Sequence, residues 1–128
     1  MEKFKLKLNN YEKSVMKLKE GTKIEEPSDI EIDGILRRYK ITFELAWKTL
    51  KDYMEYQGFS NRIGSPREII QQAFKHGIIE DGETWIKMML SRNALSHLYD
   101  ENTSRKIYKE IKKEYIELLE ALIEKLKK

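Results

Sequence analysis

The sequence contains no cysteine, which excludes disulfide bridges, zinc–thiolate sites and thiol nucleophiles. Only two histidines occur, His76 and His97, and their separation along the chain argues against a transition-metal site, so neither a metal nor another cofactor is expected. No apolar run approaches the roughly 18 residues that a membrane-spanning helix requires, and the N-terminus lacks the apolar core of a signal peptide. These absences predict a cytoplasmic protein without a membrane partner.

The sequence also has little excess of either charge, since it contains 25 basic and 22 acidic residues and its net charge is only +3. The chain is therefore no polycation, and a nucleic-acid partner would have to bind a local patch. What the sequence does contain is 40% hydrophobic and 37% charged residues with only two prolines, a composition typical of long helices. Its 128 residues predict a single domain over 1–128.

Apolar residues recur at spacings of three and four along most of the chain, which predicts helices, and no segment alternates as a strand would. The expected helices cover about residues 4–20, 30–57, 66–76, 82–90 and 103–126. Gly21 is expected to end the first, and Asp81 can cap the fourth. Short links between them predict an all-α, up-and-down four-helix bundle with an additional short helix.

Several single residues carry more specific expectations. Ser65 and Glu68 have the spacing of a capping box at the start of the third helix. Gly34, within the second helix, is interpreted as a site of close helix packing. The two tryptophans, Trp47 and Trp85, lie on apolar stripes and are assigned to the core.

The segment SRNALSHLYDEN, Ser91–Asn102, differs from the rest of the chain because it is crowded with polar residues of varied chemistry. On a continued helix these residues would share an arc of roughly 160°, on the line that faces the core one turn earlier. They are Arg92, Asn93, Ser96, His97, Tyr99 and Asp100. If the helix stays straight, they point into a groove or a subunit interface; if it breaks, they line a loop over the bundle end.

Arg92 and His97 are five residues apart, which on a regular helix separates them by about 140° and about 7.5 Å of rise. The two side chains would not contact the same atom of a ligand within one continuous helix. Convergence therefore requires a distortion near Ser96, or a second copy of the segment from a neighbouring chain.

Three blocks in this order resemble the HEPN domain family, in particular its nucleotidyltransferase substrate-binding subfamily. They are FELAWKTLKDY (43–53), SPREIIQQAF (65–74) and RNALSHLYDE (92–101), the last of which has the spacing of arginine, four residues, histidine, and tyrosine two positions later. The resemblance implies a homodimeric helical bundle, HEPN-like over the whole chain, encoded beside a separate minimal nucleotidyltransferase.

The resemblance also implies roles for the residues of the third block. In toxin–antitoxin members of the family, the HEPN protein is a metal-independent ribonuclease, and the nucleotidyltransferase silences it by adenylylating the tyrosine. Arg92 and His97 would then be catalytic, with Asn93 the polar residue beside the arginine, and Tyr99 would be the modified residue. The polar arc adds Ser96 and Asp100 as supporting residues.

Several alternatives remain open from the residues alone. Arg92 can instead pair with Asp100 or another acidic residue while His97 caps a helix end. The chain can also be a non-catalytic module that binds a substrate or docks the nucleotidyltransferase, with Arg92 binding phosphate, or a plain dimerisation bundle. The basic run that includes Arg105, Lys106 and Lys109 can bind an RNA backbone or form a solvated face.

Overall fold

The computed structural model describes residues 2–59, 64–96 and 100–128, and this part of the chain is helical with no strand. Its elements are α1 (Glu2–Thr22), α2 (Asp29–Tyr56), α3 (Pro66–Lys75), α4 (Gly82–Leu95), α5 (Glu101–Glu110), a π-helical segment η1 (Ile111–Tyr115) and α6 (Ile116–Lys127). The last three form one helical run. The predicted all-α bundle with a short third helix is confirmed, and the last helix begins two residues earlier than predicted.

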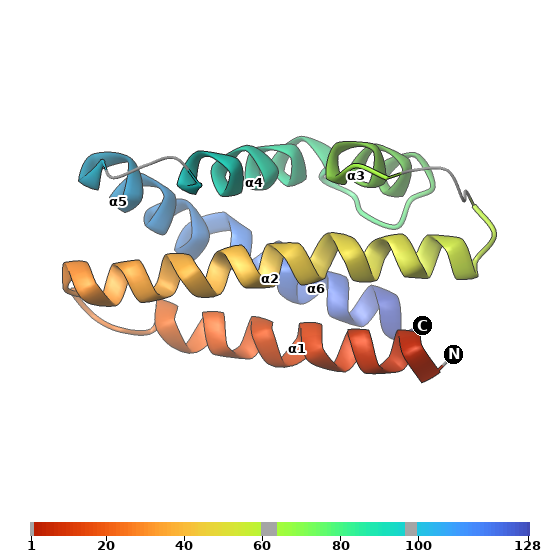
Figure 1. Cartoon of the computed structure of the whole chain (residues 1–128), viewed down its shortest axis with the longest axis horizontal. Coiled ribbons are helices and arrows are strands. Elements are labelled where there is room, and N and C mark those ends of the chain that lie inside the picture. Colours follow the sequence, from red (N-terminus) through yellow and green to blue (C-terminus); the bar gives the residue numbers. More distant parts are fainter. Residues whose placement is uncertain (1, 60–63, 97–99) are drawn as a thin grey trace.

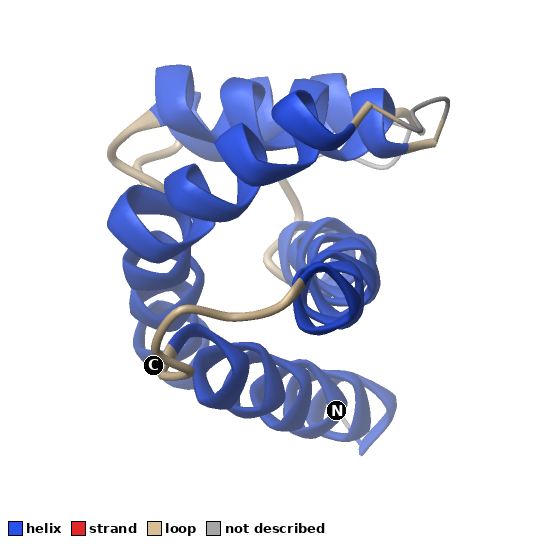
Figure 2. Cartoon of the chain, turned by 90° about the vertical axis from the view of Figure 1, so that its left-hand side faces the viewer, coloured by secondary structure: helices blue, strands red, loops and turns tan. Residues whose placement is uncertain are grey.

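The longest helix, α2, is the centre of the bundle and contacts α1, α3, α4, α5 and α6. Figure 1 shows α1 running beside it in the opposite direction, with α3 and α4 along another side. Seen end-on in Figure 2, α2 is surrounded on three sides and uncovered on the fourth. The end of α4 lies next to this uncovered side, where Arg92 contacts Glu44 of α2.

The core forms where the apolar stripes of these helices meet. Its largest fully buried side chains include Trp85, Phe43 and three tyrosines, Tyr11, Tyr39 and Tyr115. The Tyr11 hydroxyl donates to the carbonyl of Leu119 on α6 at 2.6 Å. A buried hydroxyl is costly unless it is hydrogen-bonded, so this bond both satisfies the tyrosine and joins α1 to α6.

Helix starts follow the predicted local chemistry. Ser65 and Glu68 form the expected capping box at α3, and Ser28 forms a second one with Glu31 at α2. The Asp81 carboxylate accepts the N–H of Thr84 at 3.0 Å and caps α4. Each cap satisfies backbone donors that have no partner inside the helix.

The prediction of close helix packing at Gly34 is wrong. Gly34 is exposed, and a Cβ added there would meet no atom within 4 Å. The close approach occurs instead at Gly21, where a Cβ would lie 2.8 Å from Cγ1 of Ile35. Gly21 is thus a buried packing position within α1, which continues to Thr22, and not the residue that ends the helix.

The two tryptophans differ in how deeply they are buried. Trp85 on α4 is 2% exposed and lies in the core, as predicted. Trp47 on α2 is only partly buried, packs against the edge of the core, and has its indole N–H turned to a carboxylate. Among the described residues, no helix is both long enough and apolar enough to cross a membrane.

Candidate functional site

The polar segment begins at the end of α4 and spans a break between two helices. α4 ends at Leu95 with Ser96 as its C-cap, and α5 begins at Glu101. Of the two alternatives, a straight or a broken helix, the chain therefore adopts the broken one. Arg92 and Asn93 belong to the last turn of α4, whereas His97 and Tyr99 lie outside the described residues.

Asp100 has a structural role as the N-cap of α5. Its carboxylate accepts the N–H of Asn102 at 3.1 Å and the hydroxyl of Thr103 at 2.8 Å. This carboxylate is therefore engaged by its own helix, and the alternative pairing of Arg92 with Asp100 is not formed.

Arg92 pairs instead with Glu44 in the middle of α2. Its Nη2 donates to Oε2 of Glu44 at 3.0 Å, and its Nη1 donates to Oδ1 of Asn93 at 3.3 Å. The two charged side chains are 35% and 33% exposed, so the pair lies half-buried at the surface. The contact fixes the direction of the guanidinium and joins the end of α4 to α2.

Glu44 receives further donors from its own helix, one turn later. The indole N–H of Trp47 donates to Oε2 at 3.1 Å, and Nζ of Lys48 lies 3.4 Å from Oε1. One carboxylate thus binds two cations and an indole. The sequence did not single out Glu44, because the partner of Arg92 lies 48 positions away and 22 acidic residues were available.

Beneath this pair, buried aromatic side chains hold the last turns of α4. The Tyr39 hydroxyl donates to the carbonyl of Met88 at 2.6 Å, and its ring stacks on Tyr115 at 5.7 Å between centroids. The Tyr115 hydroxyl shares a hydrogen bond of 2.9 Å with Ser91, the neighbour of Arg92. Tyr115 ends the π-helical segment, an irregularity often found near functional sites.

Both of these hydroxyls stay neutral. Burial raises the pKa of Tyr39 well above its ordinary value, and the nearby Tyr115 adds to the shift. Burial likewise raises the pKa of Tyr115, against the hydrogen bond from Ser91. The aromatic pair therefore supports the site and takes no part in proton transfer near neutral pH.

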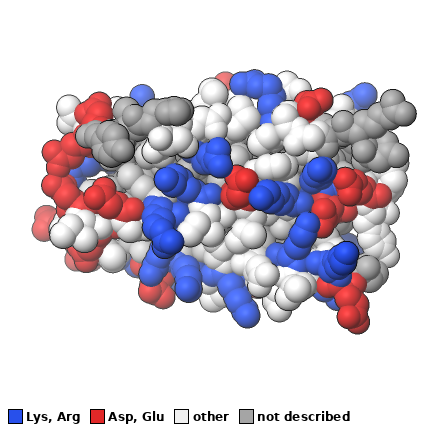
Figure 3. All heavy atoms as spheres, in the orientation of Figure 1, with Lys and Arg blue, Asp and Glu red and all other residues white. Residues whose placement is uncertain are grey.

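The cations of α5 lie in acidic surroundings. Arg105 forms an ion pair with Asp29 at the start of α2 at 2.5 Å, while Lys106 and Lys109 are exposed. The pKa of Asp29 is lowered by hydrogen bonds from Glu101 and then Arg105, and the pKa of Glu101 is raised, first by its bond to Asp29. Figure 3 shows Asp and Glu gathered at this end of the bundle. The surface around Arg105 is thus less positive than the sequence alone indicates.

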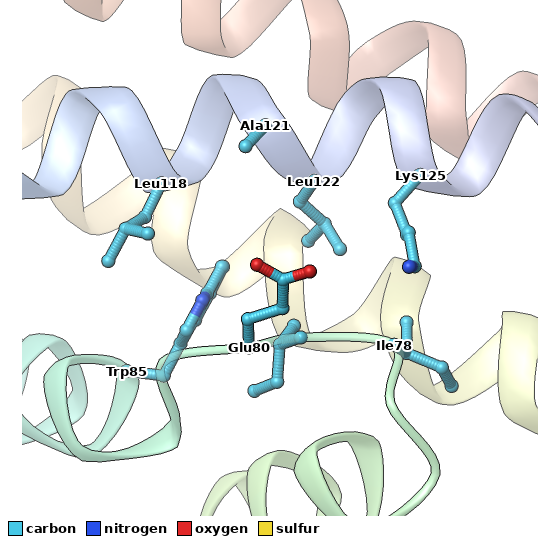
Figure 4. A pocket seen from close by; sticks show the side chains of 8 residues that line it. Ile78, Glu80, Trp85, Leu118, Ala121, Leu122 and Lys125 are labelled. Atoms are coloured by element: carbon cyan, nitrogen blue, oxygen red, sulfur yellow. The ribbon is translucent and has the colours of Figure 1, made fainter.

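Other polar groups lie away from this end of α4. His76 is the C-cap of α3, and its ring stacks on Phe59 at 4.3 Å between centroids. Figure 4 shows a pocket of about 190 Å³ between the α3–α4 connection and α6, lined by Trp85, Leu122 and other residues outside the polar segment. Over the described ranges, no cluster of three or more His, Asp or Glu side chains is placed to hold a metal ion.

The described residues thus form a small all-helical bundle in which Arg92, in the last turn of α4, is held by Glu44 of α2. The chain belongs to the family described as nucleotidyltransferase substrate binding protein like, whose family model matches residues 6–128. The HEPN resemblance of the sequence blocks is thereby confirmed at the level of the family.

Solved structures share the fold. A protein from Thermus thermophilus is 30% identical, with a TM-score of 0.84 over 92% of this chain and 99% of its own. A Haemophilus influenzae protein described as the substrate-binding domain of a nucleotidyltransferase has a TM-score of 0.82 over 94% of this chain and 99% of its own. At 23% identity, the second likeness concerns the fold alone.

A curated relative matches over part of its length. A Haemophilus influenzae protein named Probable ribonuclease HepT is 27% identical over 86 residues, which cover 65% of this chain. The match spans 59% of the length of that relative.

Proposed function

We propose that this protein is a single-domain, cytoplasmic HEPN homodimer that acts with a separately encoded minimal nucleotidyltransferase. In this proposal it is the toxin of a toxin–antitoxin pair, cleaves RNA without a metal, and is silenced by adenylylation of Tyr99. The family membership supports the nucleotidyltransferase partner, and the relative named as a ribonuclease supports the activity.

The observation that carries the proposal is the placement of Arg92. A guanidinium has five N–H donors, and those that point to Glu44 and Asn93 leave others for a ligand. Arginine binds phosphate oxygens in a bidentate way, and the half-exposed position lets a phosphate reach it. Glu44 orients the guanidinium, and because this one carboxylate is shared by Arg92 and Lys48, the three side chains keep a net positive charge that favours a phosphate.

The proposed chemistry needs an acid, a base and a cation. His97 of one copy takes the proton of the 2′-hydroxyl, whose oxygen attacks the phosphorus, while Arg92 stabilises the charge of the phosphorane. The bond from phosphorus to the 5′-oxygen breaks, and His97 of the second copy protonates that oxygen. The products are a 2′,3′-cyclic phosphate and a free 5′-hydroxyl. Because each chain supplies one such histidine, the reaction requires a dimer with a shared cleft.

The proposed silencing uses the hydroxyl of Tyr99. Its oxygen attacks the α-phosphorus of ATP, pyrophosphate leaves, and AMP remains on the tyrosine. The bulk and negative charge of AMP beside Arg92 would then exclude the RNA phosphate. Competing tyrosines are less suitable, because Tyr11 and Tyr39 are buried and donate to backbone carbonyls.

The nuclease part is tested with purified protein, EDTA and a labelled single-stranded RNA. Wild type should cleave the RNA, and His97→Ala should lower the rate by at least 100-fold because general acid–base catalysis contributes about 10²- to 10⁴-fold. His76→Ala is the matched control, as it removes the other histidine of the chain, and should retain full activity. Equal activity of the two variants would contradict the proposal.

The silencing part is tested by mass spectrometry after incubation with ATP and a nucleotidyltransferase encoded in an adjacent reading frame. One AMP should be added to the wild type and to Tyr56→Phe, which removes a tyrosine that is 53% exposed. Tyr99→Phe should remain unmodified. AMP on both variants, or on neither, would exclude Tyr99 as the acceptor.

A non-catalytic binding module is the second candidate, and the Glu44 pair favours it, because Arg92 already has a partner within the chain. In that case the protein binds or docks the nucleotidyltransferase, and nucleotide is transferred to another molecule. His97→Ala would then leave every measured activity unchanged.

A further inference from the structure

The uncovered side of α2 carries a line of basic side chains, which we call the α2 stripe. It consists of Arg37, Lys40, Lys48 and Lys51, all within about 100° of the helix surface and along about 21 Å of its length. Three carboxylates, Asp33, Glu44 and Glu55, share this line. Figure 3 shows Lys and Arg gathered over the middle of this face.

Most cations of the α2 stripe form no ion pair with a described carboxylate. Over residues 2–59, 64–96 and 100–128, only Lys48 of the four forms an ion pair, and its partner Glu44 also binds Arg92. The contrast with α5 is clear, because Arg105 at its centre forms an ion pair with Asp29. The positive surface next to Arg92 therefore follows α2.

The geometry also connects the α2 stripe to the end of α4. A groove of about 370 Å³ has Arg37, Lys40 and the acidic Asp33 on its α2 side, with Leu95 of α4 and Ser104 of α5 opposite. Further along α2, the hydrogen bond from Arg92 to Glu44 places the guanidinium beside the stripe. Arg37 and Lys40 thus lie before Arg92 along the stripe, and Lys48 and Lys51 lie beyond it.

We propose that the α2 stripe binds the sugar–phosphate backbone of a single-stranded RNA, with Arg92 on a phosphate in the middle of the bound strand. This inference rests on the proposed function and names the surface along which its substrate lies. A linear polyanion matches a line of cations, and such contacts are independent of base sequence. The half-buried Trp47 lies at the edge of the stripe, with its indole N–H bound to Glu44 and Nζ of Lys48 5.9 Å from its ring centroid. Because this ring already has partners within the chain, backbone contacts and not base stacking provide the affinity in this proposal.

The test uses the full-length protein with His97→Ala, so that bound RNA is not cleaved, and a fluorescent oligouridylate measured by anisotropy at several salt concentrations. In this background, three variants each lose three positive charges. The α2 variant carries Arg37→Gln, Lys40→Gln and Lys51→Gln. The α5 variant carries Arg105→Gln, Lys106→Gln and Lys109→Gln, which tests the basic run predicted from the sequence.

A third variant, Lys3→Gln, Lys13→Gln and Lys17→Gln, changes exposed lysines of α1 and serves as the matched control. The α2 variant should bind at least tenfold more weakly at about 0.1 M salt, with a slope of log affinity against log salt shallower by about 2, or about 0.7 for each lost contact. The α1 control should bind as the parent does. Circular dichroism spectra of all variants should be the same, because the changed residues are at the surface.

The outcomes separate this inference from the proposed function. If the α5 variant weakens binding and the α2 variant does not, the α2 stripe is not the RNA surface, whether or not wild type cleaves RNA. If the α2 variant weakens binding but wild type cleaves nothing, the inference stands and the nuclease proposal fails. If no RNA binds but the α2 variant loses its nucleotidyltransferase in a pull-down, the stripe is a protein-docking surface and the inference is wrong.

Discussion

The two halves of α4 lie on the same helix but have different surroundings. The first half begins at the Asp81 cap and buries Trp85 and Met88 in the core. The second half carries Arg92, which is 35% exposed and paired with Glu44. The first half provides stability through apolar contact, and the second presents a charge whose contribution to stability is small. Separate substitutions can therefore test folding and function independently.

The largest effect is expected in the first half. Trp85→Ala removes a large, fully buried side chain and should lower the free energy of unfolding by about 3–5 kcal/mol. Urea denaturation followed by circular dichroism measures this change. The proposed RNA cleavage, measured per folded molecule, should be unchanged, because Trp85 faces the core. A loss below 1 kcal/mol would show that α4 is not anchored by this residue.

A smaller effect is expected at the start of α4. Asp81→Ala removes the carboxylate that caps the helix and should cost about 1 kcal/mol at pH 7. Asp81→Asn is the matched control, since asparagine is an equally good N-cap, and should retain nearly all of the stability. Equal losses in both variants would mean that the negative charge, and not the cap, stabilises the helix.

The same residue predicts a dependence on pH. Hydrogen bonds from the backbone and then the hydroxyl of Thr84 hold the pKa of Asp81 below its ordinary value. Because the folded-state pKa is depressed, the stabilisation is present above the unfolded pKa of about 3.9 and is lost as pH falls through the folded pKa. Asp81→Asn should therefore lose less stability than wild type between pH 5 and pH 2, as measured by urea denaturation at each pH.

The smallest effect on stability is expected in the second half. Arg92→Gln should change the free energy of unfolding by less than about 1 kcal/mol, because half-exposed ion pairs contribute little. In the proposed reaction, RNA cleavage should nevertheless fall by at least 100-fold, since the phosphorane would lose its cation. Trp85→Ala and Arg92→Gln should thus differ in opposite ways in stability and activity. If Arg92→Gln lost as much stability as Trp85→Ala, the two halves of α4 would not have separate roles.

Most of the fold could be predicted from the sequence. The apolar spacing predicted the helices, and Ser65 with Glu68 predicted the start of α3. Gly34 was interpreted wrongly because helix propensity does not say which face of α2 is covered. The π-helical segment was also missed, since its residues, IKKEY, have the apolar spacing of an ordinary helix.

The candidate site was predicted only in part. The polar arc and the family resemblance pointed to Arg92 and its neighbours, and the break near Ser96 was one of two stated alternatives. Glu44 could not be found, because pairing across 48 positions depends on how α2 and α4 pack. The roles of His97 and Tyr99 stay predictions.

The sequence by itself determined the helices, their caps and the polar segment, because these features depend on residues within one or two helical turns. Only the tertiary structure decided which charges meet: Glu44 orients Arg92, and Asp29 neutralises Arg105. It also left one side of α2 uncovered, so that the lysines and arginines of the α2 stripe lie together at the surface. The physical reason is that ion pairs require contact between helices, and the order of residues along the chain does not specify which faces come into contact.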